Sequence, residues 1–261
     1  MNEQVERDVM EYDVLIIGGG PSGLSSAIKV KQLASAEGKD VSVCVLEKGS
    51  EIGAHILSGN VFEPTALNEL IPDWKEKEAP LNSPATKDIV KFMISGNSSI
   101  NIPFPSFLIP TFNNHGNYVM SLANFTRWLA SQAESLGVEI FPGFTAAEVI
   151  FEENIVKGVL TGEMGISKDG EKKPSYQPSM ELRGKYTVFA EGCRGHLGKQ
   201  LIKKFNLDEN RDPQHYGIGF KEIWDISPED HKEGTVMHTM GWPSNGTISG
   251  SYFYHGENNQ V

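Results

Sequence analysis

Residues 12–23 read YDVLIIGGGPSG, and this stretch decides the fold of the chain. Its first half, residues 12–17, is a run of aliphatic and β-branched side chains that is typical of a strand buried on both faces of a parallel sheet. Gly18, Gly20 and Gly23 then fit the pattern G-x-G-x-x-G. In that pattern the first glycine allows a tight turn, the second lets the backbone approach a pyrophosphate, and the third lets the next helix pack closely on the strand.

The segment that follows completes a βαβ unit. From Pro21 to Ala34 apolar residues recur at helical spacing, and Pro21 suits the first helical turn, where its missing N–H costs nothing. A second strand over residues 41–46 ends in Glu47, at the position where a carboxylate hydrogen-bonds the hydroxyl pair of a ribose. The unit therefore predicts dinucleotide binding. The carboxylate favours the free ribose of FAD or NAD over the 2′-phosphate of NADP, although Lys48 lies next to it.

Composition limits the possible partners. A net charge of −11 over 261 residues argues against nucleic acid as the main partner, and the acidic surface is either solvated or a docking face for a basic partner. The length permits one large or two modest domains. The two cysteines, Cys44 and Cys193, are too few for the four thiolates of an iron–sulfur cluster or of a cysteine-only zinc site. We therefore expect no metal site in this chain.

The sequence also limits how the chain could meet a membrane. The N-terminus is typical of neither a signal peptide nor a transit peptide. No apolar run approaches the roughly 20 residues of a membrane span, so any membrane contact would be peripheral.

Downstream, alternating helix and strand patterns predict a larger sheet with inserted hairpins. A helix from about Leu122 is followed by a strand at residues 138–141, which we interpret as a third parallel strand beside the first. Residues 185–192 are predicted to form a strand followed by a glycine turn, as residues 12–18 do. Hairpins are predicted at residues 89–102 and 147–161, and further strands at residues 216–224 and 249–255.

Two segments are less regular. Residues 164–180 are polar, with a turn at residues 168–170, and are predicted to form a surface loop. Residues 103–110 contain three prolines, which exclude a central strand. This apolar loop either covers a pocket or meets a membrane surface.

The pattern as a whole predicts an α/β chain: a doubly wound Rossmann-like domain with β-hairpin insertions, plus part of a second, incomplete domain. The first domain is predicted to be discontinuous, and the antiparallel insertions belong to the second. The expected ranges are residues 8–72 and 113–212 for the first, and residues 73–112 and 213–261 for the second.

Several motifs together are more specific than the glycine pattern alone: IIGGGPSGLSSAI, LEKGSEIGAHILSGNVFEP, NNHGNYVMSL, VFAEGCRGHLGKQL and GWPSNGTISGSYFYH. Through them the chain resembles the N-terminal half of the electron transfer flavoprotein–ubiquinone oxidoreductases, a family of the glutathione-reductase-like FAD superfamily. The resemblance runs from about residue 8 to the end of the chain. In that family the second half carries a four-cysteine [4Fe-4S] cluster, which is expected outside this chain.

The resemblance implies that the first domain is a Rossmann-like FAD-binding domain and that the second is part of an incomplete α+β quinone-binding domain. The glycine loop would hold the pyrophosphate at a helix N-terminus, Glu47 would take the adenosine ribose, and the loop of residues 54–59 would run along the flavin. Asn117 and Tyr118 would lie near the flavin ring. The cofactor-binding residues implied are Gly18, Gly20, Pro21, Ser22, Gly23, Glu47, Lys48, Ala54, His55, Leu57, Ser58, Gly59, Asn117, Tyr118, Glu191 and Gly192.

The chain departs from the family at two positions. Some relatives place an arginine near the pyrophosphate where this chain has Ser121. A Gly-Gly pair contacts the quinone in relatives, and here it reads Ser249-Gly250, so a backbone N–H contact could survive the change.

The resemblance implies the activity of an electron-transferring-flavoprotein dehydrogenase, in which electrons pass from reduced electron transfer flavoprotein through [4Fe-4S] and FAD to ubiquinone. This chain, as a fragment, is expected to be inactive alone. The expected location is peripheral, on the cytoplasmic face of a bacterial inner membrane. Two other interpretations remain open: a geranylgeranyl-reductase-like or aromatic-hydroxylase-like FAD enzyme that uses NAD(P)H, and a non-catalytic FAD-binding module.

Overall fold

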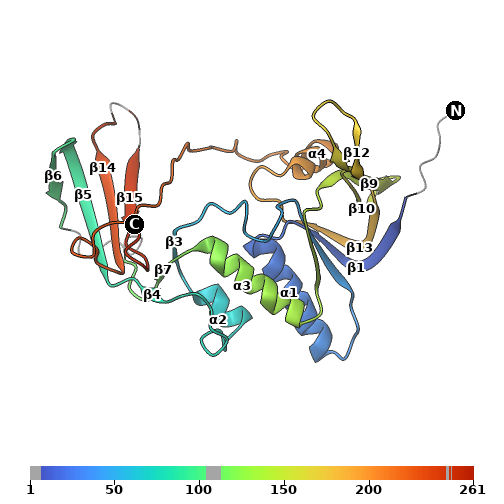
Figure 1. Cartoon of the computed structure of the whole chain (residues 1–261), viewed down its shortest axis with the longest axis horizontal. Helices are drawn as coiled ribbons and strands as arrows, with labels where there is room; N and C mark the ends of the chain where they lie inside the picture. The colour runs from blue at the N-terminus through green and yellow to red at the C-terminus, as the bar shows by residue number, and fades with distance from the viewer. Residues whose placement is uncertain (1–6, 104–112, 245–246, 248) are drawn as a thin grey trace. The chain divides into compact units, whose positions relative to one another are not determined.

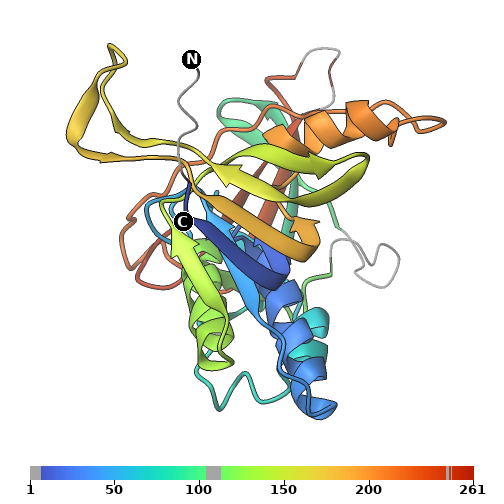
Figure 2. The same cartoon turned by 90° about the vertical axis from the view of Figure 1, so that its right-hand side faces the viewer.

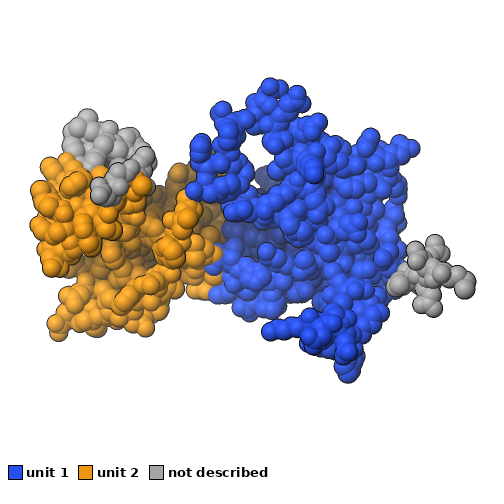
Figure 3. Space-filling view, turned by 90° about the horizontal axis from the view of Figure 1, so that it is seen from above, with its two compact units in different colours: residues 1–56, 126–216 blue, residues 57–125, 217–261 orange. Residues whose placement is uncertain are grey.

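The structure is a computed structural model that describes residues 7–103, 113–244, 247 and 249–261 (Figure 1). The chain forms two compact units, each built from two segments (Figure 3). Unit 1 comprises Met1–Ile56 and Thr126–Tyr216, and unit 2 comprises Leu57–Phe125 and Gly217–Val261. Residues 57–72 and 113–125, which the sequence placed with the nucleotide-binding part, lie in unit 2. The assignment of functions to the two predicted domains stays a prediction.

Unit 1 is built on a six-stranded sheet with the order β8-β2-β1-β13-β10-β9. The first four of these strands are parallel, and β10 and β9 continue the sheet as an antiparallel hairpin. Helix α1 (Pro21–Ala36) lies on one face of the sheet and α4 (His196–Phe205) on the other (Figure 2). The strands are β1 (Val9–Ile17), β2 (Val43–Glu47), β8 (Glu139–Pro142), β9 (Ala146–Glu152), β10 (Ile155–Thr161) and β13 (Glu181–Phe189).

The central strands are apolar because both of their faces are covered. Residues 14–17 of β1 and 43–46 of β2 are all buried. On one face α1 buries Leu24 and Ile28, and on the other α4 contributes Leu197 to the core. The predicted α/β architecture, a Rossmann-like parallel sheet with an inserted hairpin, is confirmed.

Pairing at β1 sets the position of the site. Ile17, the last residue of β1, lies beside Leu46 of β2 on one side and Phe189 of β13 on the other. The chain therefore adds strands on both sides of β1, which makes β1 the point where the strand order changes direction. In open parallel sheets, ligands bind at the carboxyl ends of the strands at such a point. The expectation that residues 138–141 lie beside the first strand was wrong: β8 pairs with β2, because β13 occupies the other edge of β1.

A partly exposed ion pair joins two neighbouring strands in the middle of this sheet. Asp13 on β1 contacts Lys185 on β13, with Nζ and Oδ1 2.5 Å apart. It also accepts hydrogen bonds from the backbone N–H of Ser42, at 2.8 Å, and from its hydroxyl, at 3.0 Å. The pKa of Asp13 is lowered to about 2, mainly by the hydrogen bond from Lys185 and next by those from Ser42.

We expect this carboxylate to make folding depend on pH in acid. Because the pKa of Asp13 is lower in the folded chain than its ordinary value, its contribution is complete above about pH 4 and is lost as the pH falls toward about 2. Urea unfolding at pH 6 and pH 3 measures this effect. From pH 6 to pH 3, the free energy of unfolding of D13N should fall by less than that of the unsubstituted chain. D169N, at an exposed turn, is the control, and equal losses for D13N and the unsubstituted chain would contradict the prediction.

Unit 2 contains two small sheets, with strand orders β15-β14-β5-β6 and β3-β7-β4. The predicted hairpin at residues 89–102 is confirmed as β5 and β6. The chain crosses between the units through α3 (Leu122–Ser135). The elements of unit 2 are β3 (Asn60–Phe62), α2 (Thr65–Leu70), β4 (Ser83–Pro84), β5 (Lys87–Ser95), β6 (Ser98–Asn101), β7 (Tyr118–Met120), β14 (Thr235–Gly241) and β15 (Gly250–Tyr254).

Two predictions about secondary structure were wrong. Residues 164–180 form a hairpin of β11 (Met164–Ile166) and β12 (Lys172–Gln177), whose pairing does not depend on a buried apolar face. Residues 216–224 alternate like a strand but form none. Ile218 and Phe220 are 91% and 92% exposed, so the alternation has no partner strand to stabilise it.

Two further points complete the fold. Most of the proline-rich loop at residues 103–110 lies outside the described residues. In the part of the chain that the structure describes, no helix is long and apolar enough to cross a membrane.

Candidate functional site

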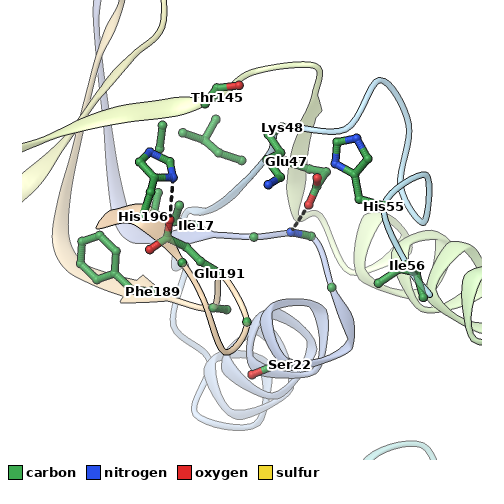
Figure 4. A pocket seen from close by; sticks show the side chains of 18 of the residues that line it. Ile17, Ser22, Glu47, Lys48, His55, Ile56, Thr145, Phe189, Glu191 and His196 are labelled. Carbon is green, nitrogen blue, oxygen red and sulfur yellow. Dashed lines mark hydrogen bonds and ion pairs between the residues drawn. The ribbon is translucent and has the colours of Figure 1, made fainter. Parts of the chain in front are cut away.

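A pocket of about 660 Å³ opens in unit 1 where the carboxyl ends of β1, β2 and β13 meet the start of α1 (Figure 4). Its volume is in the range of small-molecule sites. Nine of the residues named from the sequence line it, and they come from segments far apart in the chain. These are Gly18, Gly20, Pro21, Ser22, Glu47, Lys48, His55, Glu191 and Gly192.

The glycine loop forms the floor of the pocket. Gly18 has φ +112°, and a Cβ there would lie 2.3 Å from the carbonyl oxygen of Ala190. A Cβ at Gly23 would lie 2.0 Å from the carbonyl oxygen of Gly18, so this residue packs beneath the loop and does not line the pocket. At Gly20 a Cβ would meet nothing within 4 Å. Two of the glycines are therefore required by the protein's own packing, and the third borders open space.

Helix α1 begins at this open space. Gly20 is its N-cap residue and Pro21 its first residue, and no side chain caps the helix. The first N–H groups of a helix have no partner within the helix, and they carry the positive end of its dipole. The start of α1 therefore offers backbone donors to an anion in the pocket.

Glu47 is held in place by the loops that flank it. Its Oε2 accepts a hydrogen bond from the backbone N–H of Gly19 at 2.9 Å, and its Oε1 accepts one from Gly49 at 2.7 Å. Each oxygen keeps further acceptor capacity. The carboxylate is thus oriented at the end of β2 and can still accept hydrogen bonds from a pair of hydroxyl groups.

Glu191 lines the pocket and contacts the start of α4. Its Oε2 accepts a hydrogen bond from the backbone N–H of Gly198 at 2.7 Å, and its Oε1 accepts a longer one from Leu197 at 3.3 Å. His196 Nδ1 lies 3.3 Å from Oε1 (Figure 4). Glu191 therefore caps the start of α4 while it lines the pocket. Its predicted place beside a cofactor stays a prediction.

Removal of this cap is expected to weaken unit 1. E191A should lower the free energy of unfolding by about 1–2 kcal/mol, because two N–H groups at the start of α4 lose their acceptor. E191Q keeps an acceptor oxygen and should lose less. The measurement is urea unfolding followed by circular dichroism, with E209A, in the exposed turn after α4, as the matched control. An E191A chain as stable as E209A would show that the cap contributes nothing.

Sequence reasoning missed several residues of the pocket. Arg194 was assigned no role from the sequence, although it stands in the same glycine-rich turn as Glu191 and Gly192. Phe144 and Thr145 were assigned no role from the sequence, because they reach the pocket only through the pairing of β8 with β2. The other lining residues not named from the sequence are Ile17, Gly19, Leu46, Gly53, Ile56, Ala146, Phe189, Ala190, Gly195 and His196.

Seven of the named residues belong to unit 2, namely Leu57, Ser58, Gly59, Asn117, Tyr118, Ser249 and Gly250. Ala54 belongs to unit 1 but is exposed and does not line the pocket. The roles of all eight stay predictions.

Ser58 and Ser121 contact each other in unit 2. Their hydroxyl oxygens are 2.8 Å apart. The backbone N–H of Asn124 donates to Ser121 Oγ at 3.3 Å. Ser121 therefore accepts a hydrogen bond from a backbone N–H group in the first turn of α3.

The segment of Ser249 and Gly250 is part of the four-stranded sheet. Gly250 begins β15, and a Cβ there would lie 2.6 Å from the carbonyl oxygen of Thr239 on β14. Ser249 shares a hydrogen bond with the hydroxyl of Ser244. A glycine is therefore required at position 250 by strand packing, independently of any ligand.

The cysteines lie in contrasting environments. Cys44 is buried in β2, and burial, followed by the charge of Glu139, raises the pKa of its thiol to about 12. It is therefore a core residue. Cys193 is exposed. Within the described ranges, no group of three or more histidine, cysteine or acidic side chains could hold a metal ion.

Two family models match parts of this chain. The family model of an NAD(P)-binding Rossmann-like domain matches residues 16–71, which include the glycine loop and Glu47. The family model described as ETF-QO, ubiquinone-binding matches residues 216–261. Among solved structures, a geranylgeranyl bacteriochlorophyll reductase-like protein of Thermoplasma acidophilum has a TM-score of 0.60 at 16% identity. That match covers 97% of this chain and 55% of that protein, and it shows a common fold.

Curated relatives match nearly the whole chain. The electron transfer flavoprotein-ubiquinone oxidoreductase of Pseudomonas aeruginosa is 59% identical over 261 residues, which are 98% of this chain and 47% of that protein. The mitochondrial enzyme of the same name from Homo sapiens is 51% identical over 253 residues, covering 96% of this chain and 40% of that protein. The chain thus spans about half the length of the curated relatives it matches. The resemblance to the electron transfer flavoprotein-ubiquinone oxidoreductases is confirmed over nearly the whole chain.

Proposed function

We propose that this chain is the FAD-binding part of an oxidoreductase that passes electrons from reduced electron transfer flavoprotein to ubiquinone. The observation that carries the proposal is the 59% identity, over 98% of the chain, to a relative of that name. The pocket of unit 1 supports it independently, because its polar groups suit a dinucleotide.

The residues of the pocket fit FAD. The space at Gly20 admits a diphosphate, because no atom lies within 4 Å of a Cβ there, and the uncapped start of α1 supplies donors to it. Glu47 is oriented by Gly19 and Gly49 and would accept hydrogen bonds from the adenosine ribose. The carboxylate of Glu191 also lines the pocket, where it accepts hydrogen bonds from backbone N–H groups at the start of α4.

The remaining named residues would act around this anchor. The segment of residues 54–59 with Asn117 and Tyr118 would flank the flavin, and Ser249 and Gly250 would contact the quinone through backbone N–H groups. FAD, when bound, would supply the centre that takes up electrons and passes them to a quinone. The chain's own part is to bind, orient and shield it, so no acid–base pair is required.

An iron–sulfur cluster does not fit the cysteines of this chain. Four thiolates are needed, whereas Cys44 is buried in β2 and Cys193 is exposed. If a [4Fe-4S] cluster takes part, its ligands come from residues other than these 261. The partners we propose are electron transfer flavoprotein, ubiquinone and, through peripheral contact, a membrane surface. The proposed location is the cytoplasmic face of a bacterial inner membrane.

The first test is the visible absorption spectrum of the purified chain before and after addition of FAD and then NADH. We expect a flavin band that persists through gel filtration and does not bleach with NADH. To test the activity, residues 1–261 are joined to the remaining part of the Pseudomonas aeruginosa relative. This chimera should reduce a ubiquinone analogue when supplied with reduced electron transfer flavoprotein. A chimera that holds FAD but reduces no quinone would contradict the proposal.

A second candidate is an FAD enzyme reduced directly by NAD(P)H. The match of residues 16–71 to an NAD(P)-binding Rossmann-like model favours it. Rapid bleaching of the bound flavin by NADH, without a need for reduced electron transfer flavoprotein, would identify this candidate as the correct one.

A further inference from the structure

The charges that line the pocket of unit 1 are unequally engaged. Glu47 and Glu191 are its two carboxylates, and each accepts two backbone hydrogen bonds. Lys48 and Arg194 are its lysine and its arginine. In the described part of the chain neither cation forms an ion pair with an acid. The pocket therefore holds fixed acids and uncommitted cations, in a chain whose net charge is −11.

Arg194 is held without using its hydrogen-bond donors. Its guanidinium lies over the ring of Tyr216, with Cζ 4.9 Å from the ring centroid. Tyr216 in turn donates a hydrogen bond from its hydroxyl to Gln214. A cation–π contact uses the face of the guanidinium, so the N–H groups at its edge remain available to a ligand.

The turn that carries Arg194 lies against the glycine loop. The backbone N–H of Ala190 donates to the carbonyl of Ile17 at 2.7 Å, and the carbonyl oxygen of Ala190 approaches Gly18 so closely that no side chain fits there. Glu191 ties the other end of the turn to α4. The turn is therefore fixed at both ends, and it brings Arg194 into the same pocket as the open space at Gly20.

We propose that Arg194 is a further binding residue of this site and pairs with the diphosphate of the dinucleotide. The inference rests on the proposed function, because it concerns the same cofactor. Residues 18–22 carry no charged side chain, so the start of α1 offers a diphosphate only backbone dipoles and the hydroxyl of Ser22. The planar guanidinium donates to phosphate oxygens in a bidentate manner, whereas the ammonium group of Lys48 is a point charge, so Arg194 suits a diphosphate better.

The test is the affinity of the purified chain for FAD, ADP and adenosine, measured by calorimetry at low and high salt. R194M should bind FAD and ADP about tenfold more weakly, which corresponds to about 1.4 kcal/mol for a lost charge-assisted contact. Its affinity for adenosine should not change, because adenosine has no phosphate. The difference in affinity for ADP between R194M and the unsubstituted chain should shrink at high salt. The affinity of R194K should lie between those of R194M and the unsubstituted chain. R211M, at an exposed arginine outside the pocket, is the matched control.

The outcomes separate this inference from the proposed function. Equal affinities of R194M and the unsubstituted chain for ADP, with R211M also unchanged, would overturn the role of Arg194 and leave the FAD assignment standing. Equal losses for ADP and adenosine would also overturn it, because they would show a general disturbance of the pocket. If the unsubstituted chain bound neither FAD nor ADP, the proposed function itself would be contradicted, and the inference with it.

Discussion

Replacement of Gly18 by alanine is expected to destabilise unit 1 by about 3 kcal/mol or more. A Cβ at this position would lie 2.3 Å from the carbonyl oxygen of Ala190 and 2.8 Å from its carbonyl carbon. Both of these are backbone atoms of the turn after β13, so they cannot move aside as a flexible side chain could. The φ of +112° adds a backbone conformation that alanine rarely adopts. Urea unfolding followed by circular dichroism measures the loss.

The chain offers a control that separates the two causes. Gly38, after α1, also has a positive φ, +64°, but a Cβ there would meet nothing within 4 Å. G38A should therefore cost only the conformational part, about 1 kcal/mol. The difference between G18A and G38A measures the steric contact with Ala190. Equal losses for the two variants would contradict the close approach of the turn to the glycine loop.

Replacement of Gly20 by valine is expected to have the opposite signature: FAD binding weakened about a hundredfold or more, in a chain that still folds. Gly20 has φ −79° and ψ 178°, an extended conformation open to any residue, and a Cβ there meets no protein atom within 4 Å. A larger side chain would fill the space that we assign to the diphosphate. Loss of its contacts with the start of α1 would remove about 3 kcal/mol of binding free energy.

Two measurements on G20V and G20A are needed. The free energy of unfolding without FAD, measured in urea, should change by no more than about 1 kcal/mol, the range of an N-cap substitution. Titration with FAD should show an affinity that falls from glycine to alanine to valine at position 20. Tight FAD binding by G20V would mean that the glycine loop does not hold the diphosphate. That result would overturn the assignment of the loop without affecting the fold.

The fingerprint at the start of the chain could be predicted because its causes are local. The turn at Gly18, the start of α1 at Pro21 and the end of β2 at Glu47 all depend on residues that are close in sequence, and the structure places Gly18, Pro21 and Glu47 at one pocket. The buried strands were also recognisable, because a strand covered on both faces must be apolar throughout.

Other features could not be read from the sequence, because they depend on which strand pairs with which. The alternation at residues 216–224 resembles a strand, but Ile218 and Phe220 are exposed and pair with no strand among the residues that the structure describes. The polar hairpin of β11 and β12 is the reverse case, in which pairing occurs without an apolar pattern. The position of β8 beside β2 likewise depends on β13, which follows it in the chain by about forty residues.

The sequence by itself determined the βαβ unit, the three glycines and the acid at the end of β2, because turn geometry, helix starts and burial of a central strand depend on local residue types. Only the tertiary structure decided that the turn after β13 closes on Gly18, that Glu191 caps α4, and that Arg194 reaches the same pocket. The physical reason is that β1 and β13 pair in parallel across more than 160 residues of chain. The loops at their carboxyl ends meet because of that pairing.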